Sequence, residues 1–133
     1  MTTIERTLRI DASLEAVFRR FVEADALTEW MGESATLDPT PGGQWRLEYG
    51  DGNIAAGTFT IVDPPTRIAW TWGWEENPDV PPGSSTVEVT LAPDGDVTVL
   101  TLRHEGLPDP GAIKNHSEGW DHFLGELVEL PGR

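Results

Sequence analysis

The feature that most constrains the fold is a long amphipathic helix predicted near the end of the chain, over residues 109–130. Residues at helical spacing gather on one of its faces, which carries Ile113, Ser117, Trp120, Leu124, Leu127 and Val128. The opposite face carries Glu118, Asp121, His122, Glu126 and Glu129. Asp109 can cap the first turn, and Pro110 suits the first helical position, where its missing N–H is no loss. Pro131 and Gly132 are expected to end the helix.

The chain begins with a predicted strand and two short helices. Residues 3–10 alternate between apolar and polar side chains, as expected of a half-buried strand. The first helix, capped by Asp11 or Ser13, has a buried stripe that consists of Leu14, Val17, Phe18 and Phe21. The second helix is expected over residues 24–30, and Trp30 is expected to pack beneath the corner between the two helices.

Further strands are predicted in the middle of the chain. Their ranges are 34–38, 44–49, 54–62, 67–74, 84–91 and 97–105, with a loop over residues 75–83. Gly57 marks a bulge or a sharp bend. Short turns between successive strands require antiparallel pairing. We therefore predict one domain over residues 1–133 with an α+β fold, in which a curved antiparallel β-sheet wraps around the long C-terminal α-helix.

The strongly acidic charge of the chain limits its partners. Nine Lys and Arg face 23 Asp and Glu, which gives a formal net charge of -14. Such a chain lacks the basic surface that binds nucleic acid, and anionic membranes would repel it. No apolar run reaches the roughly 18 residues of a membrane span, and the first residues lack the apolar core of a signal peptide. We therefore expect a soluble, cytoplasmic protein that binds neither nucleic acid nor membranes.

Tryptophan is unusually frequent, with six in 133 residues. Trp70, Trp72 and Trp74 alternate with other residues, so they are predicted to form a row on one face of their strand. One interpretation is a core filled by bulky side chains. The other is an apolar cavity between the sheet and the helix, with aromatic walls and indole N–H groups that supply a few polar contacts.

On the second interpretation, the cavity would favour flat apolar ligands, and His116 or an indole N–H would fix their orientation. The cavity would be widest where the strands bend, near Gly57. Its predicted wall consists of Trp45, Phe59, Trp70, Trp72, Leu102, His116 and Trp120.

The sequence gives little sign of a metal site or a catalytic centre. The three histidines, His104, His116 and His122, do not form an H-x-x-x-H motif, and the chain has no cysteine. No G-x-S-x-G motif is present either. We therefore expect no metal and no cofactor, and we assign no catalytic residue. His122 is expected to be solvated, whereas His104 and His116 are placed at the edge of the interior.

Short motifs along residues 5 to 130 resemble one known superfamily, in the same order and at similar spacing. The matching positions are 13–18, Leu27, Trp30, 38–39, 41–46, Gly57, 63–65, 67–68, 70–72, 101–107 and 119–120. They resemble the START-like superfamily, also called SRPBCC, helix-grip or birch-pollen-allergen-like. Within it, the chain looks most like the branch named for the C-terminal domain of the activator of heat-shock-protein-ninety ATPase.

The resemblance implies a sheet of seven strands that grips the long helix around a hydrophobic tunnel. Members of the superfamily bind or transfer lipids, sterols and polyketides, and some are cyclases or aromatases. We therefore favour a binding module for a small apolar or aromatic ligand over an enzyme. The alternatives are a polyketide cyclase or dehydratase that uses the same cavity, and an interaction protein that regulates a chaperone ATPase. A homodimer is left open.

Overall fold

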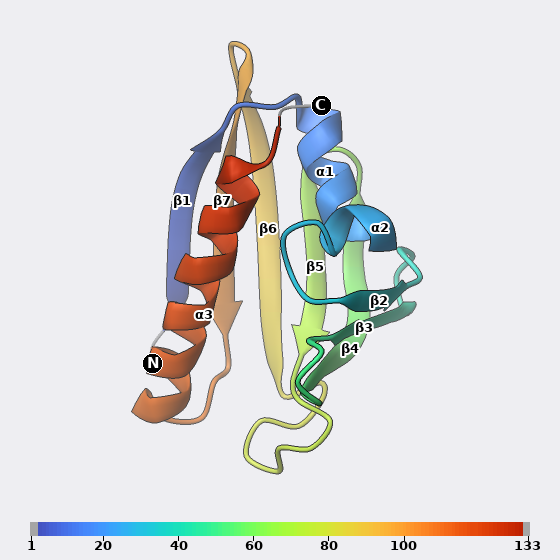
Figure 1. The fold of residues 1–133 in the computed structure, drawn as a ribbon, viewed down its shortest axis with the longest axis vertical. Helices are drawn as coiled ribbons and strands as arrows, with labels where there is room; N and C mark the ends of the chain where they lie inside the picture. Colours follow the sequence, from blue (N-terminus) through green and yellow to red (C-terminus); the bar gives the residue numbers. More distant parts are fainter. Residues whose placement is uncertain (1–2, 132–133) are drawn as a thin grey trace.

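The computed structural model describes residues 3–131 and forms one antiparallel sheet with three helices on one face (Figure 1). The order of the strands across the sheet is β1-β7-β6-β5-β4-β3-β2, and every neighbouring pair is antiparallel. The strands are β1 (Ile4–Ile10), β2 (Ser34–Leu37), β3 (Gln44–Glu48), β4 (Ile54–Asp63), β5 (Arg67–Trp72), β6 (Ser85–Asp94) and β7 (Val97–Glu105). The predicted α+β fold, with its curved sheet and long C-terminal helix, is confirmed.

The long helix α3 (Pro110–Glu129) lies in front of the strands at one side of the sheet (Figure 1). Its predicted cap is confirmed, because a side-chain oxygen of Asp109 accepts a hydrogen bond of 2.8 Å from the backbone N–H of Ala112. The buried side chains of α3 are Trp120, Leu124 and Leu127. The placement of Val128 on the buried face was wrong. It lies one position beyond the stripe and is 41% exposed. The helix ends at Glu129, before Pro131 as predicted, and Gly132 lies outside the described residues.

The short helices α1 (Leu14–Val22) and α2 (Ala24–Leu27) follow β1 as predicted. Ser13, not Asp11, caps α1 and accepts a hydrogen bond of 3.2 Å from the backbone N–H of Ala16. The helix α2 is shorter than predicted. The hydroxyl of Thr28 donates to the Ala24 carbonyl, and tighter backbone hydrogen bonds close the last turn. Trp30 is buried just beyond α2, as expected, and its indole N–H donates to the Arg20 carbonyl at 3.0 Å.

The fourth strand bends where two different neighbours pair with it. Residues 54–58 of β4 pair with β3, and the pairing with β5 shifts register between Phe59 and Ile61. A Cβ atom at Gly57 would lie 1.9 Å from the backbone carbonyl oxygen of Thr71. Glycine at this position therefore allows a close approach of two backbones, and the predicted irregularity of the strand begins two residues later.

The fifth strand ends at Trp72, two residues before the predicted end at Trp74. The reason is Gly73, where a Cβ atom would lie 1.8 Å from the carbonyl oxygen of Pro81. The loop after β5 folds back against this glycine, and Trp74 is left with a single bridge to Ala55 on β4. The row of tryptophans therefore divides, with two indoles on the sheet and the third in the loop.

Aromatic side chains fill much of the space between the sheet and the short helices. The rings of Trp45 and Trp70 stack with their centroids 5.2 Å apart and their planes 16° apart. Phe21 of α1 packs against one ring of this pair, with its centroid 6.3 Å from that of Trp70. The bulky-core interpretation therefore holds for the middle of the sheet.

Candidate functional site

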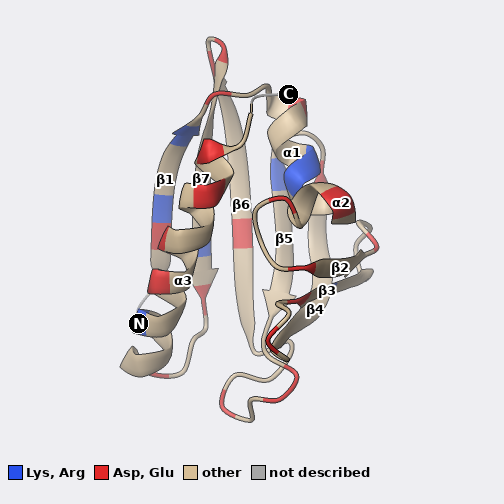
Figure 2. Ribbon diagram, viewed as in Figure 1, with Lys and Arg blue, Asp and Glu red and all other residues tan. Residues whose placement is uncertain are grey.

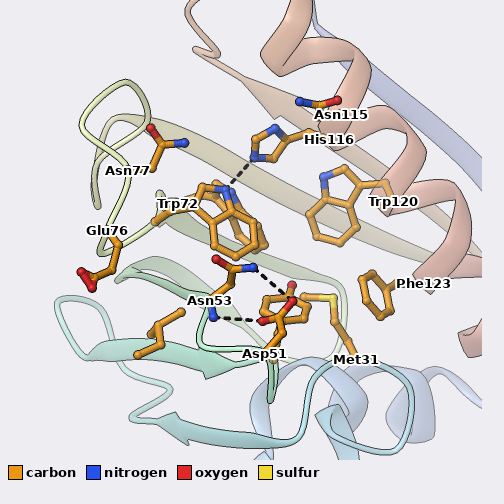
Figure 3. Close-up of a pocket in the computed structure, with 14 residues that line it drawn as sticks. Met31, Asp51, Asn53, Trp72, Glu76, Asn77, Asn115, His116, Trp120 and Phe123 are labelled. Carbon is orange, nitrogen blue, oxygen red and sulfur yellow. Dashed lines mark hydrogen bonds between the residues drawn. The ribbon is translucent and has the colours of Figure 1, made fainter.

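A pocket of about 460 Å³ opens at the end of the sheet where the turn between β3 and β4, the loop after β5 and the part of α3 from Asn115 to Phe123 meet (Figure 3). Most of its lining comes from these three segments, which are distant in the sequence. The lining residues are Met31, Tyr49, Asp51, Asn53, Ile54, Trp72, Trp74, Glu76, Asn77, Asn115, His116, Gly119, Trp120 and Phe123.

Five aromatic rings form a continuous wall of the pocket. The ring of Trp72 lies 5.5 Å from that of Trp74 and 5.5 Å from that of Trp120, between centroids. The ring of Tyr49 lies between those of Trp74 and Phe123 in this series, with centroid distances of 5.4 Å to Trp74 and 5.6 Å to Phe123. Trp72 and Trp120 are buried, whereas the other three are half-buried and reach toward the opening. The pocket therefore offers a large aromatic surface with one side open to solvent.

His116 holds one of these rings in place. Its Nε2 atom accepts a hydrogen bond of 3.0 Å from the indole N–H of Trp74. Because an indole can only donate, the proton of neutral His116 must be on Nδ1, which donates to the Ala112 carbonyl at 2.8 Å. Burial lowers the pKa of His116. The side chain is therefore an uncharged component of the wall at neutral pH, with both ring nitrogens occupied.

His104 has the same role in a deeper layer of the wall. The indole N–H of Trp120 donates to its Nδ1 atom at 3.0 Å, so the proton of the neutral ring is on Nε2. That proton is donated to the Ser85 hydroxyl at 2.9 Å, which in turn donates to the Trp72 carbonyl at 3.0 Å. Burial, with a smaller contribution from nearby His116, lowers the pKa of His104 to about 3. This chain of hydrogen bonds connects the ring of Trp120 to the backbone of Trp72 through an uncharged histidine.

The charged side chains of the lining are all acidic. Asp51 and Glu76 line the pocket from the β3–β4 turn and from the loop after β5, and the described lining includes no Lys or Arg. Figure 2 shows red and no blue on these two segments. The backbone N–H and side-chain amide of Asn53 donate to Asp51 at 2.9 and 3.1 Å, and they lower the pKa of its carboxyl. Burial and then the charge of Asp51 raise the pKa of Tyr49.

Residues 11–132 match the model of one protein family, described as activator of Hsp90 ATPase homolog 1-like protein. The match covers most of the chain. The protein belongs to this AHSA1-like family. No curated protein matches the chain significantly.

Solved structures support the same assignment. An AHSA1-like protein from Rhizobium etli is 38% identical, with 96% of this chain and 80% of that chain covered and a TM-score of 0.77. An HSP90 activator from Plasmodium falciparum is 26% identical over 94% of this chain and 92% of that chain, with a TM-score of 0.79. CalU16 from Micromonospora echinospora is 28% identical over 94% of this chain and 73% of that chain, with a TM-score of 0.76.

The structure divides the predicted wall of this AHSA1-like domain into two groups. Trp72, His116 and Trp120 line the pocket. The other four predicted residues do not line it and are at most 1% exposed within the packed core, namely Trp45, Phe59, Trp70 and Leu102. One reason is that side chains of the short helices cover part of the sheet, since Phe21 of α1 packs against Trp70. The opening is left at the end of the sheet, and Gly57 does not belong to its lining.

Several lining residues were not predicted from the sequence. A signal existed for Phe123, which lies seven residues after His116 and three after Trp120, and therefore near the same face of α3. For Tyr49, strand alternation over residues 44–49 puts it on the same face as Trp45, but the predicted wall did not include it. Asp51 and Asn53 carried no such signal. They lie in a turn, and which distant residues a turn contacts cannot be read from the local sequence.

Neither a metal centre nor a membrane-spanning helix is found in the described range of the chain. Within residues 3–131, no three His, Cys, Asp or Glu side chains are grouped so that they could hold a metal ion. No helix in the same range is long and apolar enough to cross a membrane.

Proposed function

We propose that this AHSA1-like domain binds a small apolar or aromatic molecule in the pocket between α3 and the end of the sheet. The observation that carries the proposal is a pocket of about 460 Å³ with five aromatic rings along its wall. This volume falls within the roughly 300–1,000 Å³ of typical ligand pockets, which are also mostly apolar with a few polar groups. The polar groups here include the amides of Asn77 and Asn115.

The hydrogen bonds of His116 favour binding over catalysis. A general base needs a free lone pair within reach of the substrate. The Nε2 lone pair of His116 already accepts the indole N–H of Trp74, and its Nδ1 proton is donated to the Ala112 carbonyl. His104 is engaged in the same way and does not line the pocket. A cyclase or dehydratase reaction would therefore have to rely on the exposed carboxylates of Asp51 or Glu76.

Two glycines on α3 allow a direct test. A Cβ atom at Gly119 or at Gly125 would meet open space, but only Gly119 lines the pocket. Gly119→Leu should place its side chain in the pocket without disturbing the core, and Gly125→Leu is the matched control. Binding is measured by tryptophan emission during titration with planar aromatic compounds, since Trp72, Trp74 and Trp120 would be in contact with the ligand.

The expected result is a change in emission for the wild type and for Gly125→Leu, and at least a tenfold loss of affinity for Gly119→Leu. Equal affinity in all three proteins would place binding outside the pocket and refute the proposal. So would the absence of any emission change across the panel of compounds.

A second candidate function is regulation of a chaperone ATPase. The observation that favours it is the similarity to the HSP90 activator from Plasmodium falciparum, at 26% identity over 94% of this chain. Its test is the ATPase rate of Hsp90 with and without this protein. Stimulation that survives in Gly119→Leu would mean that this activity does not depend on the pocket.

A further inference from the structure

We propose that the ligand of the pocket is an organic cation, in which an aromatic or alkyl group carries a quaternary ammonium or a protonated amine. This inference rests on the proposed function and adds to it the charge of the ligand. It is carried by three features of the pocket: the aromatic rings of its wall, the acidic side chains of its lining, and two uncharged histidines, of which His116 lines the pocket and His104 lies behind it.

The aromatic wall is suited to a cation. The faces of Trp, Tyr and Phe rings carry negative electrostatic potential, and cages of such rings recognise quaternary ammonium groups. Five rings from three segments come together here, with neighbouring centroids 5.4 to 5.6 Å apart. A neutral aromatic ligand would also fit against them, so the rings alone do not determine the charge.

The acidic side chains favour the cation over the neutral ligand. Asp51 and Glu76 enter the lining from different segments, with Asp51 close to Asn53 and Glu76 at the outer edge of the pocket (Figure 3). Asn53 fixes the Asp51 carboxylate through two hydrogen bonds and keeps it ionised. The charge of Asp51 acts on Tyr49 inside the wall, where it contributes to the raised pKa of the phenol. The same field would stabilise a positive charge in the pocket.

The histidines do not oppose that charge. Each accepts an indole N–H on one ring nitrogen and is kept uncharged by burial. The same two hydrogen bonds occupy the N–H groups of Trp74 and Trp120, which would otherwise be donors for an anion. The indole N–H of Trp72 has no partner among the described residues, but a single neutral donor does not hold an anion. Lys114, on the first turns of α3, is exposed and does not line the pocket.

The test compares three probes that share one ring system and differ in charge. They are 2-naphthylmethyl-trimethylammonium, 2-naphthylmethanol and naphthalene-2-sulfonate, each titrated against tryptophan emission at neutral pH. The cation should bind at least threefold more tightly than the neutral probe and at least tenfold more tightly than the anion. The double variant Asp51→Asn, Glu76→Gln should weaken binding of the cation by about three- to tenfold and should weaken binding of the neutral probe less.

A matched control separates the pocket from the overall acidity of the chain. Asp63 and Asp96 are exposed and lie outside the pocket. Changing both to Asn also removes two negative charges, the same number as the pocket variant. This control should bind all three probes as the wild type does. Equal loss in both double variants would assign the effect to the net charge of -14 and overturn the inference.

The outcomes also distinguish the inference from the proposed function. If the neutral probe binds as tightly as the cation and the acidic residues have no effect, the inferred positive charge of the ligand is wrong. The proposed function, binding of a small molecule in the pocket, is then still supported. If no probe changes the emission, the proposed function itself fails. Circular dichroism of each variant shows whether a loss of binding reflects a loss of the fold.

Discussion

Acidification from pH 7 to pH 5 should destabilise the domain through His104. This side chain is 0% exposed, and its pKa in the folded protein is about 3, compared with 6.5 for an ordinary histidine. Between these values the unfolded chain binds a proton that the folded chain does not, so stability falls as the pH falls. For one such group the loss is about 2 kcal/mol at pH 5 and increases toward pH 4. His116 adds to it in the same direction, because burial also lowers its pKa.

The assay is urea unfolding at pH 7, 6 and 5, followed by tryptophan emission and far-ultraviolet circular dichroism. Other groups also titrate in this range, and the net charge of -14 decreases as acid is added. The variant His104→Gln isolates the effect, because glutamine does not titrate. It should be less stable at pH 7 by about 1–3 kcal/mol, since at least one hydrogen bond to Trp120 or Ser85 is lost.

The decisive quantity is the difference between the pH slopes of the two proteins. The wild type should lose about 2 kcal/mol more than His104→Gln between pH 7 and pH 5. Parallel slopes would mean that the native state protonates as easily as the unfolded chain. That result would refute the assignment of His104 as a buried, uncharged hydrogen-bonding partner of Trp120.

Three further predictions concern stability and can be checked by the same unfolding assay at pH 7. Trp120→Ala should cost about 3–5 kcal/mol, because it removes a large buried ring and leaves Nδ1 of His104 without its donor; a loss below about 1 kcal/mol would contradict its place in the core. Gly57→Ala should cost about 3 kcal/mol, because its Cβ would meet the Thr71 backbone, and a neutral effect would show that the two strands can separate freely. Gly125→Ala should add about 0.5–1 kcal/mol, because the site is exposed, helical and sterically open; destabilisation would point to an unseen contact there.

The fold could be predicted to a large extent because its signals are local. Alternating side chains identify a strand, helical spacing identifies α3, and a capping residue such as Asp109 marks where a helix begins. The end of β5 was missed because a distant segment decides it. The strand β5 ends at Trp72 because the loop returns over Gly73, and that contact cannot be read from the residues on either side of the glycine.

The candidate site was only partly predictable for a similar reason. Strand alternation places Trp70 and Trp72 on the same face of the sheet, and both are indeed buried. The two indoles differ in what lies against them. Phe21 of α1 packs against Trp70, whereas Trp72 lines the pocket. The sequence predicts the face of each indole, but the path of the helices determines which indole a ligand can reach.

Hydrogen bonding distinguishes the stacked pair of core tryptophans, Trp45 and Trp70, from Trp74 and Trp120 of the wall. The indole N–H groups of Trp45 and Trp70 have no partner among the described residues, so packing alone holds these rings. At the pocket, by contrast, the indole N–H groups of Trp74 and Trp120 each donate to a histidine. The backbone carbonyl of Trp72 accepts a hydrogen bond from the Ser85 hydroxyl.

Burying a histidine behind aromatic rings costs free energy, because a polar group leaves water. In return, its hydrogen bond to an indole N–H fixes the orientation of that ring. A ligand that meets rings already held in place loses less conformational entropy on binding. The two histidine–tryptophan pairs therefore hold part of the wall in place in the way that the proposed binding function requires.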